Sequence, residues 1–291
     1  MERMRRLILT LLIGILLTGS GAFAAPPIRK DGGTAPTIAL NFTVSLVPGK
    51  PTAGKPFMIR YRLTDPSGKP PTLDSTTPSP QSHLVVLSKD LTYFKHLHPG
   101  QMAPGEFEGA LTLEHGGSYV AFITATPADD SPQVKRFAFE VAGPPAPKEE
   151  SEPPAQANLD TVTSLDHDIY LSTLPEELHP GPAKLSFEIT QGADLAKDLE
   201  PYLGMSGHLV VLSEDAEDYL DVRLLDPSED IPLPKGMGKP LGNASGETHA
   251  PPVVTFLVDF PTDGLFRAWG EFQTPDGVIV APFRVQVTPE I

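Results

Sequence analysis

The chain has 291 residues and a formal net charge of −15, with 37 acidic side chains against 22 Lys and Arg. Such an acidic surface repels phosphate backbones and anionic lipids, which argues against nucleic-acid and membrane-surface partners. The sequence contains no cysteine, which excludes disulfides, thiolate zinc sites, iron–sulfur clusters and copper centres that need a Cys ligand. The 34 prolines fit short strands and many turns better than long helices.

The N-terminus has the pattern of an export signal. Three arginines within the first six residues precede an apolar stretch, residues 7–18, and the small-residue triplet Ala22-Phe23-Ala24. The alternative is a membrane anchor, but a helix of this length would reach only about 18 Å, short of the ~30 Å hydrocarbon core. We therefore predict a signal peptide over residues 1–24, no later membrane span, and a periplasmic or secreted protein.

Two low-complexity segments organise the remaining chain. Residues 25–36 are rich in Pro and Gly, and residues 143–158 contain five prolines and three glutamates. Prolines and like charges keep such segments extended and prevent them from packing. We predict a flexible lead-in over 25–36, a first domain over 37–142, a linker over 143–158 and a second domain over 159–291.

The two predicted domains share a sequence repeat. The run HLVVLSKD beginning at His83 reappears as HLVVLSED beginning at His208, an offset of 125, and Gly117-Ser-Tyr119 matches Gly264-Leu-Phe266 at an offset of 147. The difference of about 22 residues fits the Pro/Gly-rich stretch 226–252 as an insertion in the second copy. This pattern indicates an internal duplication.

The hydrophobic periodicity of both copies is that of β-strands. Apolar residues alternate with polar ones in several short segments that are separated by turn residues. The one exception is a possible short helix near 193–202. We predict a mainly β chain of two tandem immunoglobulin-like antiparallel β-sandwiches. The expected strands include 38–46, 56–63, 107–113, 118–126, 136–141, 185–190, 254–260 and 283–287.

Histidines concentrate in the first copy. In an extended chain, residues two apart point to the same side about 6.5–7 Å apart, so His96 and His98 can converge on one ion with metal–nitrogen bonds near ~2.0–2.1 Å. His83 can add a third nitrogen, and His115 or the thioether of Met102 a fourth ligand. Imidazole suits Cu(II) or Zn(II), and an added Met favours Cu(I). The sequence therefore predicts a copper or zinc site in the first domain.

A structural role for His83 is the alternative. It shares strand parity with aliphatic residues, and His208 keeps the same place in the second copy, where Asp221 and Arg223 align with the H-x-H pair. Arginine repels a cation and cannot ligate one. A metal site in the second domain is therefore disfavoured, and the repeated histidine can be structural in both copies.

Three further side chains lie outside this site in our interpretation. His167 and His179 stand in loop-like surroundings and are expected to face solvent. Trp269 shares a strand face with Arg267 and Glu271, opposite the more apolar face, which suggests partial exposure. It can pack across a sheet, the favoured alternative, or stack on a sugar or a protein partner.

A family resemblance joins these elements. The second copy contains Gly207-His-Leu-Val-Val-Leu212, and the first follows its own version of this run with Phe94 and an H-x-H-P element, His96–Pro99. This arrangement resembles the secreted bacterial YtkA-like β-sandwich domains, in which such a run often leads into an H-x-H-P element. Those domains tend to occur beside envelope proteins that handle copper or heavy metals. The resemblance implies an exported β-sandwich protein with two tandem copies of this domain.

No catalytic constellation is visible in the sequence. A nucleophile elbow, an H-E-x-x-H helix, a phosphate-binding glycine loop and a dinucleotide fingerprint are all absent from it. We therefore expect a non-enzymatic protein and hold two hypotheses. The first is an envelope metal-handling accessory. The alternative is a structural or adhesive envelope module whose sheet edges or 226–252 insertion contact a protein or glycan, with structural histidines.

Overall fold

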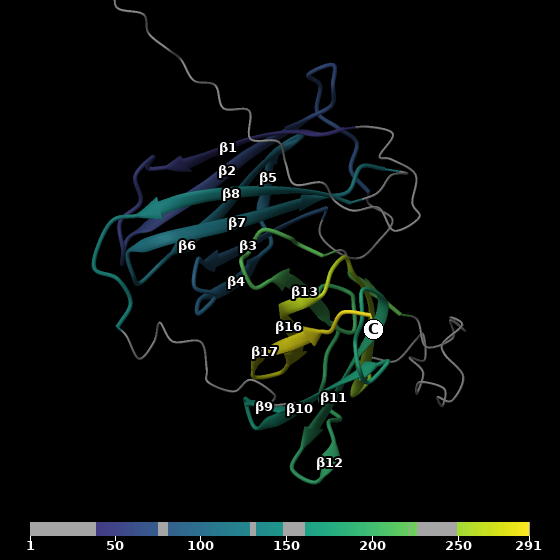
Figure 1. The fold of residues 1–291 in the computed structure, drawn as a ribbon. Coiled ribbons are helices and arrows are strands. Elements are labelled where there is room, and N and C mark those ends of the chain that lie inside the picture. The colour runs from purple at the N-terminus through teal and green to yellow at the C-terminus, as the bar shows by residue number, and fades with distance from the viewer. Residues whose placement is uncertain are drawn as a thin grey trace, which may run out of the picture.

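The computed structural model in Figure 1 describes residues 39–74, 81–128, 132–147, 161–220, 222–225 and 249–290. The predicted signal peptide, the whole lead-in, residues 148–158 of the linker and residues 226–248 of the insertion lie outside these residues. Every regular element in the described ranges is a β-strand, and none of these residues forms a helix capable of crossing a bilayer. The short helix expected near 193–202 is not formed. That segment contains β12 (Asp194–Leu195), which pairs with a longer strand.

The first domain is a sandwich of two four-stranded antiparallel sheets. One sheet has the order β1 (Asn41–Val47), β2 (Pro56–Thr64), β6 (Glu106–Thr112), β5 (Gly100–Ala103), and the other β4 (Phe94–Leu97), β3 (Ser82–Ser88), β7 (Gly117–Ala125), β8 (Gln133–Val141). Along β2, buried Phe57, Ile59 and Leu63 alternate with outward-facing residues, so one face of the sheet supplies the core.

The second domain repeats this plan with a larger outer sheet. A six-stranded sheet has the order β14 (Val222–Leu224), β15 (Val253–Phe260), β11 (Gly181–Gln191), β10 (His167–Leu174), β9 (Thr161–Ser164), with β12 paired to β11, and it faces a three-stranded sheet of β13 (His208–Ser213), β16 (Gly264–Thr274) and β17 (Gly277–Val287). Phe187, Phe256 and Phe272 fill the core between the sheets. The predicted fold class, two tandem immunoglobulin-like antiparallel sandwiches, is confirmed.

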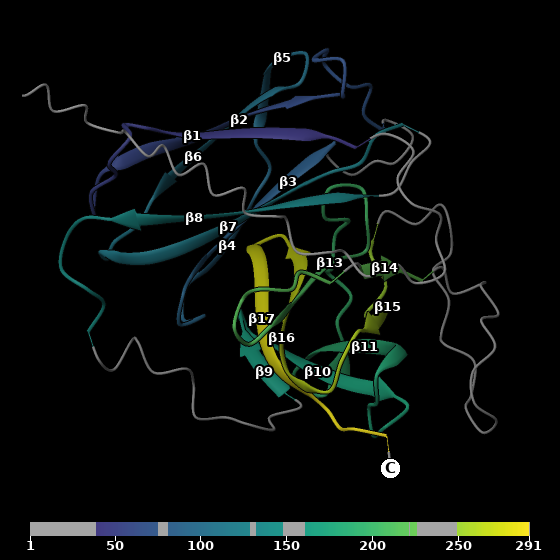
Figure 2. The same ribbon diagram turned by 45° about the horizontal axis from the view of Figure 1, so that its top comes forward.

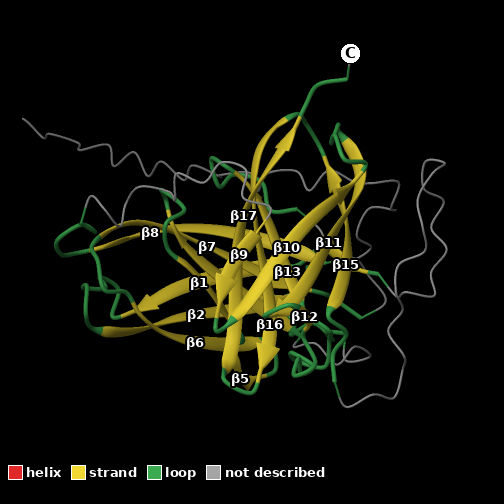
Figure 3. Cartoon of the chain, turned by 90° about the horizontal axis from the view of Figure 1, so that it is seen from below, coloured by secondary structure: helices red, strands yellow, loops and turns green. Residues whose placement is uncertain are grey.

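The two sandwiches pack directly against each other. A third apolar group, here called the junction cluster, joins the sheet of β3 and β7 to the sheet of β13 and β16, and Figures 1 and 2 show these sheets facing one another. Seen from below, strands of the first domain cross those of the second steeply (Figure 3). The junction cluster comprises Val85, Leu87, Leu91, Val120, Phe122, Val210, Leu212, Ala216 and Trp269.

The repeated HLVVLS run explains why this junction forms. In β3, Leu84 and Val86 enter the core of their own domain, whereas Val85 and Leu87 enter the junction cluster. The strand β13 does the same with its four central residues. A strand covered on both faces needs apolar residues at consecutive positions, which is what this continuous apolar run provides.

The domains meet through equivalent faces. Val85 pairs with Phe122 across β3 and β7, and Val210, which lies 125 residues later, pairs with Trp269 across β13 and β16. All four residues belong to the junction cluster. An interface in which both partners use the same surface brings equivalent residues towards one another, as in a two-fold dimer.

Matching turns border the junction on each side. Leu91 and Ala216 adopt left-handed φ values of 60° and 56°, and each donates its backbone N–H to the serine carbonyl three residues before it, at 2.9 Å. An aspartate in each turn, Asp90 or Asp215, accepts from that serine hydroxyl at 2.5 Å. These bonds hold both turns in one shape, so each inserts a buried residue into the junction cluster.

Candidate metal centre between the domains

Three histidines of the first domain converge at the edge of the junction. His83 lies on the junction-facing side of β3, His96 lies on β4 opposite Val85, and His98 follows the end of β4. One ligand atom from each ring lies within 4.8 Å of those of the other two. The structure therefore brings together the three imidazoles that the spacing of the sequence selected.

The second domain adds a fourth imidazole. His208, the first residue of β13, has its ring centroid 5.7 Å from that of His83, 5.8 Å from that of His96 and 6.2 Å from that of His98. Tyr202 packs edge-on against the rings of His208 and His98, at 5.2 Å and 6.0 Å. We call His83, His96, His98 and His208 the histidine cluster.

A buried carboxylate orients one of these rings. Nδ1 of His96 donates to Oε2 of Glu271 at 2.5 Å, and both side chains are only 3% exposed. Because a carboxylate only accepts, the proton of His96 is on Nδ1 and its Nε2 carries a lone pair. Nδ1 of His83 lies 2.9 Å from this Nε2 and donates to it. A ring whose Nδ1–H is held by a carboxylate, which leaves the lone pair on Nε2, is typical of metal-ligating histidines.

Two other ring nitrogens of the histidine cluster, Nε2 of His98 and Nε2 of His208, are buried without a hydrogen-bond partner among the described residues. Burial, followed by the neighbouring His96 and His208, lowers the pKa of His98 to about 3. Burial and His96 lower the pKa of His208 to about 4, against a hydrogen bond to the Tyr202 backbone that raises it. Both rings are neutral at pH 7, which is the form that binds metals.

The spacing of these nitrogens suits a first-row divalent ion. Metal–nitrogen bonds of ~2.0–2.1 Å in a tetrahedral site separate the ligand atoms by roughly 3.3–3.4 Å. The His83–His96 nitrogen distance of 2.9 Å and the 4.8 Å limit for the three-histidine group lie on either side of that value. Burial and Glu271 raise the pKa of Tyr202 to about 12, so its phenol stays protonated and is no anionic ligand.

Two predicted ligands lie elsewhere. His115 belongs to the turn before β7, whereas His83 pairs with Thr124 near the other end of that strand, roughly 23 Å away at the rise of a β-strand. Met102 lies on β5, in the other sheet of the domain, and is 68% exposed. The structure therefore does not bring His115 or Met102 to the three histidines.

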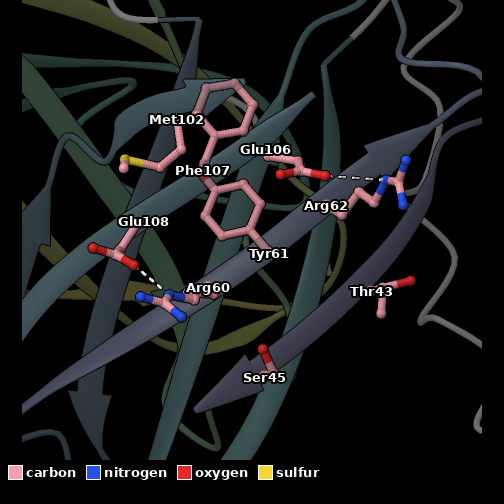
Figure 4. Close-up of a pocket in the computed structure, with 9 residues that line it drawn as sticks. All are labelled: Thr43, Ser45, Arg60, Tyr61, Arg62, Met102, Glu106, Phe107 and Glu108. Atoms are coloured by element: carbon pink, nitrogen blue, oxygen red, sulfur yellow. Dashed lines mark hydrogen bonds and ion pairs between the residues drawn. The ribbon is translucent and has the colours of Figure 1, made fainter. Parts of the chain in front are cut away.

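Met102 instead borders a groove on the outer face of the sheet β1-β2-β6-β5. The groove has a volume of about 330 Å³ (Figure 4). Arg60 and Arg62 form ion pairs there with Glu108 and Glu106 on the neighbouring strand β6. Its charges are thus paired across strands, and the thioether faces this groove.

The aligned segment of the second domain has a different place. Val222–Leu224 joins β15 in the outer sheet, where Arg223 pairs with Leu257, whereas Phe94–Leu97 pairs with β3 in the junction sheet. Asp221 lies outside the described residues. The second domain therefore has no counterpart of the H-x-H pair beside His208 within the part that the structure describes, and it contributes to the site of the first domain.

Trp269 is a junction residue. Its ring stacks on Phe94 of the first domain with centroids 4.8 Å apart and an interplanar angle of 10°, and it is only 4% exposed. The partial exposure suggested by its strand face is wrong, because the other domain covers that face. In the sequence, Trp269 and Glu271 share one strand face, and this was the signal that both belong to the same buried surface.

His167 is buried, contrary to the solvent-facing position expected. It is 1% exposed, and its ring donates from Nδ1 to the Leu165 carbonyl at 2.7 Å and from Nε2 to Asp198 at 3.0 Å. Two acceptors require both nitrogens to carry protons. Burial lowers the pKa of His167, but its hydrogen bonds to Asp198 and Leu165 outweigh this effect and the net shift of the pKa is upward. His179, half-buried, bonds the Thr288 carbonyl at 3.1 Å.

This raised pKa predicts how second-domain stability depends on pH. The His167 contribution is fully present below the unfolded value near ~6.5 and is lost as pH rises through the folded pKa. Urea midpoints followed by circular dichroism are expected to fall as pH rises above neutrality in the wild type. His167→Gln should flatten that slope, and His179→Gln, as the matched control, should retain it. Equal slopes in His167→Gln and the wild type would contradict this assignment.

Comparisons with known proteins give one family-model match and likenesses to several solved structures. Residues 163–289 match the model of a domain of unknown function, DUF8832. No curated protein matches the chain. Among solved structures, the chain is similar to the Escherichia coli adhesin FdeC (10% identity, 86% of this chain and 66% of that chain, TM-score 0.27). It is also similar to fibronectin(III)-like modules of Clostridium thermocellum CbhA (12% identity, 85% of this chain and 95% of that chain, TM-score 0.20). A further likeness is to the bacterial integrin-binding protein invasin (13% identity, 87% of this chain and 40% of that chain, TM-score 0.22). The chain thus spans less than two thirds of FdeC and less than half of invasin, and at these TM-scores the likenesses carry no argument about function.

Proposed function

We propose that the chain is an exported, non-enzymatic envelope protein that binds one copper or zinc ion through His83, His96 and His98. The observation that carries this proposal is the convergence of three imidazoles with ligand atoms within 4.8 Å of one another. The predicted signal peptide supports a periplasmic or secreted location. A metal-handling role in the envelope follows from that location and this site.

The donor set favours a divalent ion. All the converging atoms are imidazole nitrogens, which suit Cu(II) and Zn(II), whereas Cu(I) prefers thiolates and thioethers. The chain has no cysteine, and Met102 faces a groove on another sheet. A buried polar atom without a partner costs about 1–3 kcal/mol, and a bound ion would satisfy Nε2 of His98.

Metal titration tests this function. Residues 25–291, treated with a chelator and titrated calorimetrically with Zn(II) and Cu(II), are expected to bind one ion per chain. His96→Ala and His98→Ala should each weaken binding by at least ~100-fold, because each removes a ligand bond. His115→Ala is the matched control and should bind as the wild type does. A stoichiometry well below one, or unchanged affinity in both ligand variants, would reject the function.

A structural or adhesive envelope module that contacts a protein or glycan is the second candidate. It is favoured by the hydrogen-bond chain from Glu271 through His96 to His83, which gives these buried polar groups protein partners. In that case the histidines are structural and partner binding is independent of metal. The same titration separates the two candidates, since a structural cluster gives no binding heat with either ion.

A further inference from the structure

The metal site proposed above lies at the boundary between two domains. Its first-domain ligands are carried by β3 and β4, and the ring of His208 approaches them from β13 of the second domain. Glu271, which holds His96, comes from β16 of the second domain. Neither domain alone thus contains all four imidazoles, and the carboxylate that orients His96 belongs to the other domain.

We propose that His208 is the fourth ligand, so that one divalent ion is bound by both domains and locks them in the packed arrangement. This inference rests on the proposed function and extends it from a site within one domain to a clamp between two. The ligand class is a first-row divalent cation that accepts four neutral imidazoles, with Zn(II) and Cu(II) as the ions to test.

The hydrogen bonds of His208 match those of a metal ligand. Its ring is bonded to the backbone of Tyr202, and because Nε2 has no partner among the described residues, that bond is made through Nδ1. His96 shows the same arrangement with Glu271 in place of a carbonyl. In both rings a hydrogen bond fixes Nδ1–H and leaves the lone pair on Nε2, which is the tautomer that a metal requires.

The packing of the domains explains why His83 and His208 meet. They occupy equivalent positions, each at the start of the HLVVLS run, and the domains pack through equivalent faces. The rings of these two equivalent residues approach each other, with centroids 5.7 Å apart. The repeated histidine can be structural in an isolated copy. In the packed domains, His83 and His208 form a pair across the junction.

The clamp is continuous with the apolar junction. Phe94 and His96 are two residues apart on β4, and Trp269 and Glu271 are two residues apart on β16. Residues at this spacing lie on the same strand face, about 6.5–7 Å apart. The Phe94–Trp269 stack and the His96–Glu271 hydrogen bond are therefore neighbouring contacts between β4 and β16. A metal ion bound in the histidine cluster would therefore hold together the same faces of β4 and β16 that the Phe94–Trp269 stack joins.

The consequence is a linkage between metal binding and domain docking. An ion that binds the docked domains more tightly than the separated ones stabilises the docked state, and this stabilisation grows with the logarithm of the free ion concentration above the dissociation constant. Four protein ligands also close the coordination sphere, as in structural rather than catalytic zinc sites. We therefore expect the ion to hold the tandem rigid and not to act on a substrate.

The only tryptophan of the chain reports on this junction. Trp269 is buried between the domains, so its emission shifts to longer wavelength when they separate. Residues 25–291, chelator-treated, are titrated with Zn(II) as wild type, His208→Ala and the matched control His115→Ala. Urea unfolding is then followed by Trp269 emission with and without zinc.

We expect His208→Ala to bind zinc at least tenfold more weakly than wild type through the three remaining histidines. Zinc should raise the urea midpoint of the Trp269 transition in wild type and His115→Ala, and much less in His208→Ala. Equal affinity and equal zinc protection in His208→Ala and wild type would overturn the clamp but leave the three-histidine function standing. No zinc binding by the wild type would overturn the function itself.

A measurement on the wild type tests the clamp even if the His208→Ala variant does not fold. Imidazole 15N chemical shifts of the wild type, recorded with and without Zn(II), identify each coordinated nitrogen. The clamp predicts metal-induced shifts for four rings including Nε2 of His208. Shifts confined to the three first-domain rings would overturn it.

Discussion

Replacing Trp269 with alanine is expected to destabilise the docked chain by about 3–5 kcal/mol and to resolve unfolding into two transitions. The indole is buried between the domains and stacks on Phe94 with centroids 4.8 Å apart, a contact that adds about 0.5–1.5 kcal/mol beyond its buried area. Its loss leaves a cavity in the junction cluster. Each domain keeps its own core, so the domains should then unfold separately.

Chemical unfolding followed by far-ultraviolet circular dichroism, together with small-angle scattering, measures this effect. Trp269→Phe is the matched control, because a smaller aromatic ring can still stack on Phe94 and is expected to cost far less than alanine. A broader distribution of sizes in scattering should accompany Trp269→Ala alone. A single transition with an unchanged midpoint in Trp269→Ala would show that the junction contributes little to stability.

An ion pair at the rim of the junction contributes much less. Arg136 of β8 donates to the Ala216 carbonyl at 2.9 Å and to Glu217 at 2.7 Å, both in the second domain. The Glu217 side chain is largely exposed, and exposed ion pairs typically contribute about 0–1 kcal/mol. Docking thus depends mainly on burial of the apolar junction cluster, and this ion pair helps to set the orientation of the domains.

The sandwiches were predictable because their signal is local. Alternating apolar residues in segments such as β2 specify which face is covered, and turn residues separate the segments. The junction is a different matter. The consecutive apolar residues of the HLVVLS run show that both faces of a strand are covered, but they do not say by what. The burial of Trp269 follows only from the partner domain.

The candidate site was partly predictable for the same reason. His96 and His98 share a short segment, and strand geometry alone directs both to one side. His115 and Met102 are near in sequence but far from the cluster, because the turn containing His115 lies beyond the opposite end of β7 and β5 belongs to the other sheet. Proximity in sequence is a poor guide once the chain changes sheets.

His208 and Glu271 required the docked arrangement. The repetition of a histidine at the start of both HLVVLS runs was a signal, yet it fits a structural residue in each copy equally well. Only packing through equivalent faces makes it a pair across a junction. Glu271 has no local signal beyond the strand face that it shares with Trp269, since its partner His96 is 175 residues away.

Glu271 provides the second large effect. Glu271→Gln is expected to weaken Zn(II) binding by about 10–100-fold while leaving the domains docked. The amide oxygen can still accept from Nδ1 of His96, so the ring keeps its tautomer and position. What is lost is the negative charge that makes Nε2 a stronger donor and that partly balances the cation. Glu271 is therefore a positioning residue that acts through His96.

A charge-matched substitution separates this role from a general effect of removing an acid at the junction. Glu217→Gln deletes a carboxylate that also spans the two domains, through Arg136, but does not touch the histidine cluster. Calorimetric titration with Zn(II) should show wild-type affinity for Glu217→Gln and weakened affinity for Glu271→Gln, with similar urea midpoints when metal is removed. If both variants lost affinity equally, the effect would come from net charge. If neither did, the bond between Glu271 and His96 would support the fold alone, and the second domain would act on the ion only through His208.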